Sequence, residues 1–423
     1  MHRIHIVGRA ALGLAAAVLI TSCAPEDNEV LGPQFSGNNE LFRSYVALGN
    51  SLTAGYQSRG ISDATQRQSY AFLLAQRMGT RYAYASLQGR GCNPPVTNFQ
   101  TQAGGTTAAP ITAAARPTIC DLRSATANTD ILTNVGVPNA SSFDPIDVDG
   151  TPFSNILTSL ILGGKTQVQR ALAADPTFAS IWIGNNDVLG FAVADGRTAA
   201  PTGLAGMTPT ATFTANYDAM IAQLIAGAPD LEGVLIGVVQ VANAPIMFPA
   251  AALSNATFKA GFDGLSGVVT TLDPSCLPGG AGFTSLINTF IVFQIRAGAH
   301  PSTIACVPGG TSGAIPAPVG DILVLDPTEQ ATISARVTSY NNYISAKAAS
   351  LGWAYYDPNP TLAALRAAGT VVTNIPTLGA TNTFGTGMSL DGTHPGAPLH
   401  RTIANTLIPI INAQYSTTLS LVP

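Results

Sequence analysis

Three short polar segments, far apart in the chain, each adjoin an apolar run or a helical pattern, and they constrain the fold most. GNSLTAG (49–55) follows the apolar run 45–48, and IGNND (183–187) closes the run 179–183. DGTHP (391–395) precedes the last helical pattern. Parallel sheets with helices on both faces bind ligands beyond the carboxyl ends of their strands. The sequence therefore predicts an α/β fold in which one edge of the sheet collects all three segments.

Short apolar runs alternate with helical patterns along most of the chain. Candidate strands cover 45–48, 131–135, 179–183, 234–241 and 353–356. Candidate helices cover 69–78, 156–174, 212–226, 328–351 and 398–414. The helix from 328 is the clearest, because Pro327 precedes it and Gly352 ends it. The alternation predicts a doubly wound, flavodoxin-like α/β/α sandwich with a parallel central sheet.

Two stretches, 88–130 and 243–320, interrupt this alternation. Both are rich in Gly, Pro, Thr and Ser, and each contains two cysteines. Loops this long inside a compact domain are usually functional or disordered, and the cysteines argue against disorder. We interpret them as walls or lids around the site, with surface loops that make no substrate contact as the alternative. Residues 42–423 then form one domain that carries two long insertions.

The chain begins with an export signal. Arg3 and Arg9 provide a basic start, and the apolar stretch 10–20 is too short to span a bilayer as a mature anchor. The stretch ends in ITSC, which resembles the lipobox of bacterial lipoproteins. That resemblance implies removal of residues 1–22 and acylation of Cys23, which then anchors the protein to the membrane. An ordinary secreted protein that is cleaved nearby is the alternative.

Residues 23–41 form the acylated cysteine and a polar, flexible tether. The lipobox resemblance places the protein outside the cytoplasm, bound by lipid to the cell envelope. Ala24 provides no evident retention signal for the inner membrane, and the acidic Glu26 and Asp27 favour outward export. We therefore expect the outer membrane of a Gram-negative bacterium.

Four cysteines remain besides Cys23, namely Cys92, Cys120, Cys276 and Cys306. An even number in an exported chain predicts two disulfides. The pairs Cys92–Cys120 and Cys276–Cys306 are the natural choice because each lies within one insertion, although four cysteines permit three pairings. A zinc site is the weaker alternative, because the chain has no CxxC motif and only His300 lies near a cysteine.

The charge composition argues against nucleic acid as a binding partner. The formal net charge is −4, only 10% of residues are charged, and no basic cluster occurs, so nucleic acid is not an expected partner. The hydrophobic content of 46% is ample for one large core. The sequence leaves the oligomeric state open.

Acyl transfer needs a nucleophile, an oxyanion donor and an acid–base pair, and the three segments supply all of them. Ser51 lies in a Gly-flanked turn after a strand, and DGTHP places Asp391 and His394 three residues apart. With these blocks the chain resembles a GDSL-type esterase/lipase of the SGNH hydrolase superfamily over about residues 43–414. The resemblance implies Ser51 as nucleophile, His394 as general base and Asp391 as its partner.

The same resemblance implies the residues around the triad. Gly49 lets the chain bend before Ser51, while Asn50 replaces the family's Asp at a position outside the triad. IGNND matches the G-x-N-D block, which implies Gly184 and Asp187 as loop residues and Asn186 as a side-chain oxyanion donor.

A further segment, NVGVPNA (134–140), resembles a family block that contributes a backbone N–H to the oxyanion hole, together with Ser51. Asn139 stands where glycine is usual. Asn139 keeps the donor in place if it adopts a left-handed conformation, which Asn tolerates better than most residues. Gly136 is the fallback donor.

The resemblance thus implies a serine carboxylic-ester hydrolase, esterase- or lipase-like, that forms an acyl-enzyme on a small ester or acyl lipid without metal or cofactor. Two alternatives stay open: a polysaccharide O-acetyl esterase, and a non-catalytic lipoprotein that binds glycan or lipid. The only tryptophans, Trp182 and Trp353, lie in expected strands, which disfavours a carbohydrate platform. His400 is expected to be a surface or packing residue.

Overall fold

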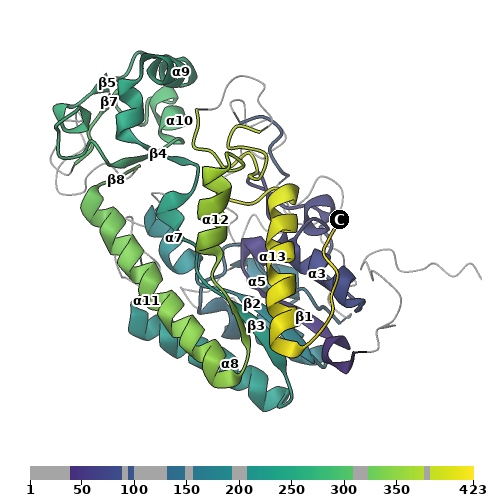
Figure 1. Ribbon diagram of the computed structural model, residues 1–423. Helices are drawn as coiled ribbons and strands as arrows, with labels where there is room; N and C mark the ends of the chain where they lie inside the picture. The colour runs from purple at the N-terminus through teal and green to yellow at the C-terminus, as the bar shows by residue number, and fades with distance from the viewer. Residues whose placement is uncertain are drawn as a thin grey trace, which may run out of the picture.

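The computed structural model describes residues 39–87, 94–99, 131–147, 156–192, 207–307, 323–375 and 382–423. Within them, a parallel sheet of four strands in the order β1-β2-β3-β9 forms the centre of the molecule. The strands are β1 (Tyr45–Gly49), β2 (Phe178–Trp182), β3 (Glu232–Ile236) and β9 (Ala354–Tyr356). Helices cover both faces of this sheet (Figure 1), which confirms the predicted α/β/α architecture.

The expected strand at 131–135 is reduced to a single parallel bridge between Asn134 and Ala47 of β1. The Ala47 N–H donates to the Thr133 carbonyl (2.8 Å), and the Val135 N–H donates to the Ala47 carbonyl (2.9 Å). This segment lies on the side of β1 opposite β2, so the direction of winding reverses between β1 and β2. Ligands of doubly wound folds bind at such a reversal.

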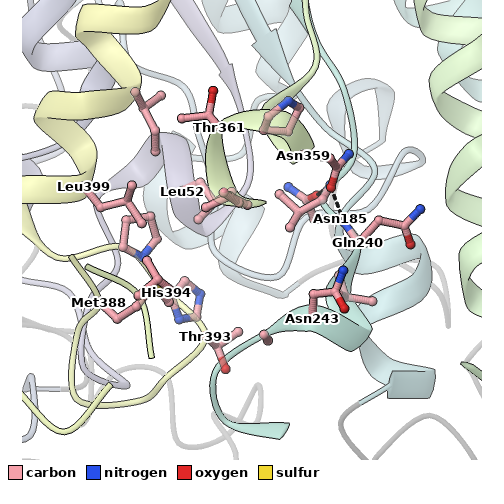
Figure 2. Close-up of a pocket in the computed structure, with 18 of the residues that line it drawn as sticks. Leu52, Asn185, Gln240, Asn243, Asn359, Thr361, Met388, Thr393, His394 and Leu399 are labelled. Carbon is pink, nitrogen blue, oxygen red and sulfur yellow. Dashed lines mark hydrogen bonds between the residues drawn. The ribbon is translucent and has the colours of Figure 1, made fainter. Parts of the chain in front are cut away.

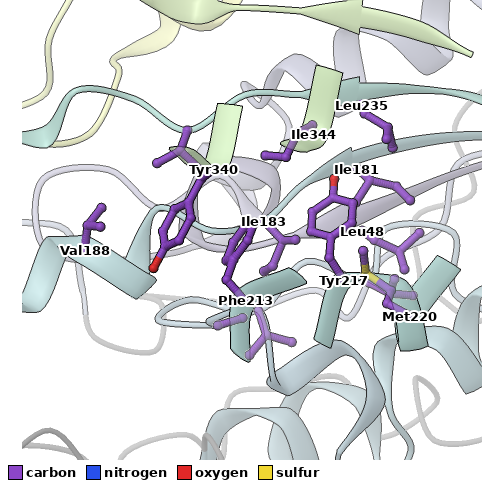
Figure 3. Packing of buried hydrophobic residues seen from close by; sticks show 14 of the residues in the cluster. Leu48, Ile181, Ile183, Val188, Phe213, Tyr217, Met220, Leu235, Tyr340 and Ile344 are labelled. Atoms are coloured by element: carbon purple, nitrogen blue, oxygen red, sulfur yellow. The ribbon is translucent and has the colours of Figure 1, made fainter. Parts of the chain in front are cut away.

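The two faces of the sheet are covered by different helices. Along β1, Tyr45 and Ala47 pack on the side of α3 (Tyr70–Met78) and α13 (Ala397–Tyr415). Val46 and Leu48 pack on the opposite side, against the helices α5 (Ile156–Leu162), α6 (Gln167–Ala173), α8 (Thr210–Gly227) and α11 (Pro327–Leu351). Figure 3 shows Phe213 and Tyr217 of α8 together with Tyr340 and Ile344 of α11 on this side. The sheet is therefore buried on both faces, which explains its continuous apolar runs.

Local sequence signals predict most helix and strand bounds, but the structure corrects one expected helix and one expected strand. The helix α11 (Pro327–Leu351) ends at left-handed Gly352, as predicted, and it begins with a capping box of Asp326 and Glu329. The single helix expected at 156–174 is two helices, because the left-handed pair Gly163 and Gly164 breaks it. Those helices are α5 (Ile156–Leu162) and α6 (Gln167–Ala173). The strand expected at 234–241 begins and ends earlier, as β3, while α8 covers Thr210–Gly227.

Shorter helices connect these elements and position the loops. The α-helices are α1 (Ser51–Ala54), α2 (Asp63–Gln66), α7 (Asn186–Ala192) and α12 (Pro358–Ala367). The 3-10 helices outside the large insertion are η1 (Glu40–Phe42), η3 (Asp144–Ile146) and η5 (Val241–Asn243).

The insertion expected at 243–320 contains regular structure, and we call residues 244–325 the inserted subdomain. Its antiparallel strands are β4 (Met247–Pro249), β6 (Leu286–Asn288) and β8 (Val324–Leu325), and its parallel pair is β5 (Thr271–Leu272) with β7 (Thr303–Ile304). Its helices are η6 (Ala250–Ser254), α9 (Ala256–Ser266), η7 (Pro274–Cys276) and α10 (Ile291–Arg296). Figure 1 shows it at one end of the molecule, beside the start of α11.

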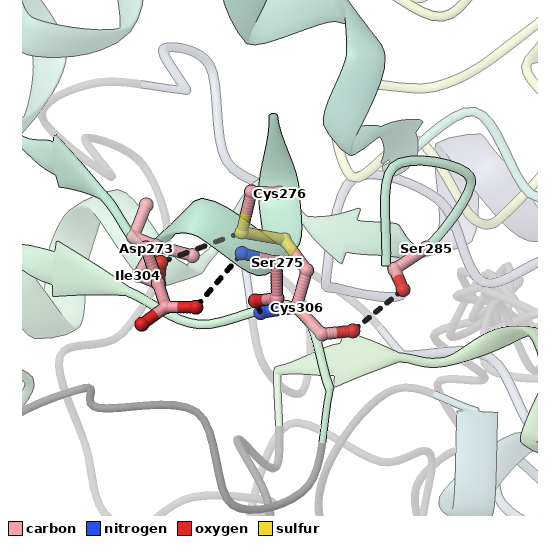
Figure 4. The surroundings of a disulfide bond; sticks show 6 residues. All are labelled: Asp273, Ser275, Cys276, Ser285, Ile304 and Cys306. Atoms are coloured by element: carbon pink, nitrogen blue, oxygen red, sulfur yellow. Dashed lines mark hydrogen bonds between the residues drawn. A yellow bond between two sulfur atoms is a disulfide. The ribbon is translucent and has the colours of Figure 1, made fainter. Parts of the chain in front are cut away.

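A disulfide between Cys276 and Cys306 crosslinks the inserted subdomain, which confirms this predicted pair. Both cysteines are fully buried in a separate apolar cluster that includes Phe248 and Phe262. Figure 4 shows the bond together with Ser285, whose hydroxyl donates to the Cys306 carbonyl at 2.7 Å.

Several predicted features lie outside the described residues. They are the export signal and most of the tether, Cys23, the cysteines Cys92 and Cys120, and most of the insertion at 88–130. Among the residues that are described, no helix is both long and apolar enough to span a membrane.

Candidate active site

The turn after β1 presents Ser51 at the carboxyl edge of the sheet. The Asn50 side chain accepts a hydrogen bond from the Leu52 N–H (3.0 Å) and so caps α1, of which Ser51 is the first residue. Gly49 is required there, because a Cβ would lie 2.2 Å from Thr53 Oγ1 and 2.7 Å from the Trp182 carbonyl oxygen. Ser51 is 6% exposed.

The structure brings Ser51, His394 and Asp391 into one hydrogen-bonded chain. Ser51 Oγ lies 2.9 Å from Nε2 of His394, and Nδ1 of His394 lies 2.9 Å from Oδ2 of Asp391. The Tyr56 ring packs on the imidazole at a centroid distance of 4.8 Å, which restricts its orientation. These contacts match the arrangement of a nucleophile, a base and an orienting carboxylate.

The Asp391 carboxylate is surrounded by donors. Its Oδ1 accepts from the Ser389 hydroxyl (3.0 Å) and from the N–H groups of Thr393 (2.9 Å) and His394 (2.8 Å). Its Oδ2 accepts from the backbone N–H of Arg59 at 2.9 Å. Burial alone would raise the pKa of Asp391, but the charge and N–H groups of His394, with the Arg59 N–H, hold it well below its usual value. Asp391 therefore stays ionised.

A strained turn at 57–60 supplies part of this support. Ser58 and Arg59 both have positive φ, 52° and 61°, although neither is glycine. Gln57 and Gly60 exchange backbone hydrogen bonds of 2.8 and 3.0 Å across the turn. The Ser58 N–H donates to Ser389 Oγ at 2.9 Å. Such backbone strain is commonly found at functional sites, and here it aims two N–H groups at the loop that carries Asp391.

The loop after β2 is tied to the segment that holds Asn139. Nδ2 of Asn186 donates to the Ala140 carbonyl at 2.8 Å. Asp187 accepts from the backbone N–H (2.8 Å) and the hydroxyl (2.7 Å) of Ser142. Burial raises the pKa of Asp187 to about 6 even though the Ser142 hydrogen bonds lower it. Gly184 has a φ of +116°, and a Cβ there would lie 2.8 Å from the Phe213 ring.

Asn185, which the sequence patterns did not single out, is a second amide in this loop. Its Oδ1 accepts from the Val239 N–H at 2.9 Å, whereas Nδ2 is buried with no hydrogen-bond partner among the described residues. Asn185 and Asn186 both line the cavity beside Ser51. The doubled Asn of the IGNND segment was the only sequence signal for it.

The two candidate backbone donors in the 134–140 segment differ. Asn139 is exposed and has a φ of +64°, the left-handed conformation that its predicted role requires. The Gly136 N–H already donates to Oδ1 of Asn134 at 3.0 Å. A Cβ at Gly136 would also lie 2.9 Å from the Ala54 nitrogen, so close packing accounts for the glycine. Asn139 is therefore the better donor candidate of the two.

A cavity of about 360 Å³ opens beside Ser51 and His394, between α12, α13 and η5. Figure 2 shows Leu52, Met388 and Leu399 on one side and Asn185, Gln240 and Asn359 on the other. Trp182, Tyr356 and Ile403 are buried lining residues. The lining is predominantly apolar with a few polar side chains, which is the usual character of a small-molecule site.

His400 is a packing residue, as expected. It is fully buried, and its Nδ1 accepts from the Tyr70 N–H at 3.2 Å. Burial, and to a lesser degree the charge of His394, lowers the pKa of His400 to about 3. His400 therefore stays neutral and does not contact Ser51.

Similarities to known proteins extend over most of the chain. The family model of GDSL-like lipases and acylhydrolases matches residues 45–407. A protein assigned as a GDSL-like lipase from Parabacteroides merdae is 11% identical, with a TM-score of 0.35 over 87% of this chain and 94% of its own. An extracellular lipase from Streptomyces rimosus is 15% identical, with a TM-score of 0.35 over 88% of this chain and 99% of its own. No curated protein matches the sequence.

Proposed function

The chain belongs to the GDSL-like lipase/acylhydrolase family, and on that basis we propose that it is a serine carboxylic-ester hydrolase with Ser51, His394 and Asp391 as its catalytic triad. The observation that carries the proposal is the chain of two 2.9 Å hydrogen bonds that links Ser51 Oγ, the imidazole and the carboxylate. A binding protein on an inactive scaffold has no need for that complete arrangement.

In the proposed reaction, Ser51 Oγ attacks the ester carbonyl carbon while His394 Nε2 accepts the hydroxyl proton. Asp391 stabilises the imidazolium that forms. The tetrahedral oxyanion accepts hydrogen bonds from the Asn186 amide and from the N–H groups of Asn139 and Ser51. Collapse expels the alcohol, which takes the proton from His394. Water then attacks the acyl-enzyme while His394 accepts its proton. The acid leaves as Ser51 Oγ takes this proton back from His394, which restores the free enzyme.

The cavity beside Ser51 supports an ester with an apolar group as substrate. Leu52, Met388 and Leu399 line it close to His394. Carbohydrate sites usually present aromatic platforms, but Trp182 is only 1% and Trp353 only 5% exposed. Both indole N–H groups donate to backbone carbonyls. The lining therefore favours a lipid-like ester over an acetylated polysaccharide.

We further propose that the protein is exported and held at the cell envelope by acylation of Cys23, because ITSC ends an export signal. An anchor of this kind would keep the domain close to acyl lipids. Incorporation of labelled palmitate that is lost in Cys23→Ser would support the anchor, and an unlabelled soluble protein would contradict it.

The decisive test is hydrolysis of p-nitrophenyl esters from acetyl to palmitoyl by wild type and Ser51→Ala. We expect Ser51→Ala to lower kcat by about 10⁴-fold or more, because the nucleophile is lost. Ser350→Ala, which removes an exposed hydroxyl from α11, is the matched control. Circular dichroism must show that the variants are folded. Equal turnover by Ser51→Ala and wild type would refute the triad.

A further inference from the structure

Among the described residues, the rim of the cavity beside Ser51 carries one cationic side chain, that of Arg366. Its lining includes three solvent-exposed residues, Asn243, Ala363 and Arg366. Arg366 is the only Lys or Arg among the described residues that line the cavity, and no Asp or Glu is among them. The whole chain has a formal net charge of −4. A positive charge at this rim is therefore not part of a general basic surface.

Arg366 is held in place without an acidic partner among the described residues. It lies near the end of α12, and one Nη donates to the Asn243 carbonyl of η5, across the rim. The other Nη donates to Thr373 Oγ1 at 3.3 Å. A guanidinium has five N–H donors, so these two contacts leave others for a ligand. Partial burial lowers the pKa of Arg366, yet an arginine remains charged at neutral pH.

We infer that the substrate is an amphiphilic ester that carries both an apolar group and an anionic group, and that Arg366 binds the anion. This inference rests on the proposed esterase function. The apolar wall formed by Leu362, Leu399 and Ile403 accommodates the hydrocarbon. Carboxylate and phosphate match the guanidinium fork, and such charge-assisted hydrogen bonds are stronger than neutral ones. None of the described lining residues is acidic, so none of them repels the anion.

The experiment uses two pairs of esters, and one member of each pair carries an anionic group that the other lacks. In the first pair, p-nitrophenyl octanoate is compared with the p-nitrophenyl monoester of octanedioic acid, which places the anion on the acyl side. In the second pair, octanoyl glycerol is compared with octanoyl glycerol phosphate, which places the anion on the alcohol side. Each pair is assayed with wild type, Arg366→Gln, Arg366→Lys and Arg401→Gln. Arg401 is an exposed residue of α13 that does not line the cavity, so its variant is a control for net charge.

We expect Arg366→Gln to raise KM about tenfold for the anionic member of one pair, since hydrogen bonds to charged groups are strong but solvent weakens them at an exposed rim. The neutral member should change less than about twofold. Arg366→Lys should restore part of the preference because it keeps the charge. The pair that responds identifies which side of the ester carries the anion.

Equal changes for charged and neutral members, or the same loss in Arg401→Gln, would overturn the inference while leaving the esterase function intact. Failure of wild type to hydrolyse any of the four esters would instead refute the esterase function. Calorimetric titration with octyl phosphate then decides the anion site independently. Binding that is weakened in Arg366→Gln supports the site, and equal binding to both proteins overturns it.

Discussion

The central sheet and the inserted subdomain contribute to the site in different ways. The central sheet with its loops supplies Ser51, Asn186, Asp391 and His394. The inserted subdomain supplies none of them but contacts the loop that carries Asp391: the Ile246 N–H donates to the Gly392 carbonyl at 3.0 Å. Phe290 of the subdomain also lies under the Arg59 guanidinium, 4.7 Å from the ring centroid. One region carries the proposed triad, and the other contacts the residues around it.

The two regions are also stabilised differently. The strands of the central sheet are three to five residues long, parallel, and buried between two layers of helices. Those of the inserted subdomain are two or three residues long, and this region is crosslinked by Cys276–Cys306. Short strands bury little surface and gain little from propensity. A disulfide supplies stability that a small core lacks.

The largest expected effect is therefore on the inserted subdomain, in the double variant Cys276→Ala/Cys306→Ala. Loss of a crosslink over a separation of 30 residues should cost about 3–4 kcal/mol of local stability in the chain-entropy model. Calorimetry should show a new transition at lower temperature. Turnover of p-nitrophenyl acetate at room temperature should stay within about threefold, because no residue of the proposed triad lies in the subdomain. Parallel loss of activity and subdomain structure would show that the regions are not separable.

The next largest expected effect is on how the stability of the central region depends on pH. His400, in the core, has its pKa lowered to about 3 by burial and the charge of His394, whereas an unfolded histidine titrates near 6.5. Between these values the unfolded state binds a proton that the native state does not. The free energy of unfolding therefore decreases as the pH is lowered, by up to ~1.4 kcal/mol per pH unit. His400→Gln should flatten this slope between about pH 6.5 and 5, as measured by denaturant unfolding.

Two carboxyl groups, Asp187 in the core and Asp263 in the inserted subdomain, also affect how stability depends on pH. Asp187, with its pKa raised to about 6, takes up a proton in the native state and so offsets part of the slope. It is present in both proteins and cancels in their difference. In the inserted subdomain, burial would raise the pKa of Asp263, but hydrogen bonds from Lys259 and Thr270 lower it overall. Its contribution is lost only below the usual carboxyl range, so Asp263→Asn should leave the slope between about pH 6.5 and 5 unchanged.

The same contrast explains how much of the fold the sequence predicts. The strands of the central sheet are apolar runs that nearby polar residues or glycines bound. The residues Asp326, Glu329 and Gly352 mark the two ends of α11. The break at Gly163 and Gly164 was missed because apolar residues continue on both sides of it. The strands of the inserted subdomain are too short to show any periodicity, so only the cysteines indicated order there.

For the site, short sequence motifs predicted Ser51, His394 and Asp391, which the structure places in one hydrogen-bonded chain. The supporting turn could not be foreseen, because Ser58 and Arg59 are not residues that signal a left-handed backbone. The contact of Ser389 with Ser58 joins positions 331 residues apart. The rim formed by Asn243 and Arg366 likewise depends on how η5 and α12 meet in space. Local patterns do not encode such distant pairings.

The smallest expected effect tests whether Asp391 is positioned by the central sheet and its loops without help from the inserted subdomain. Ser389 accepts from the Ser58 N–H (2.9 Å) and donates to Asp391 Oδ1 (3.0 Å). Ser389→Ala should lower kcat about tenfold with KM changed less than about twofold, because the carboxylate loses one donor that orients it. The kcat and KM values are measured with p-nitrophenyl butyrate.

Two further variants sharpen this test. Ser180→Ala removes another buried hydroxyl, bonded to Tyr45 within the sheet, and should lower stability without changing kcat. Phe290→Leu removes the ring under Arg59 and should leave kcat within about twofold, since the contribution of a cation–π contact at an exposed arginine is small. A loss of kcat in Phe290→Leu as large as that in Ser389→Ala would contradict the division of roles. The inserted subdomain would then act as part of the machinery that orients Asp391.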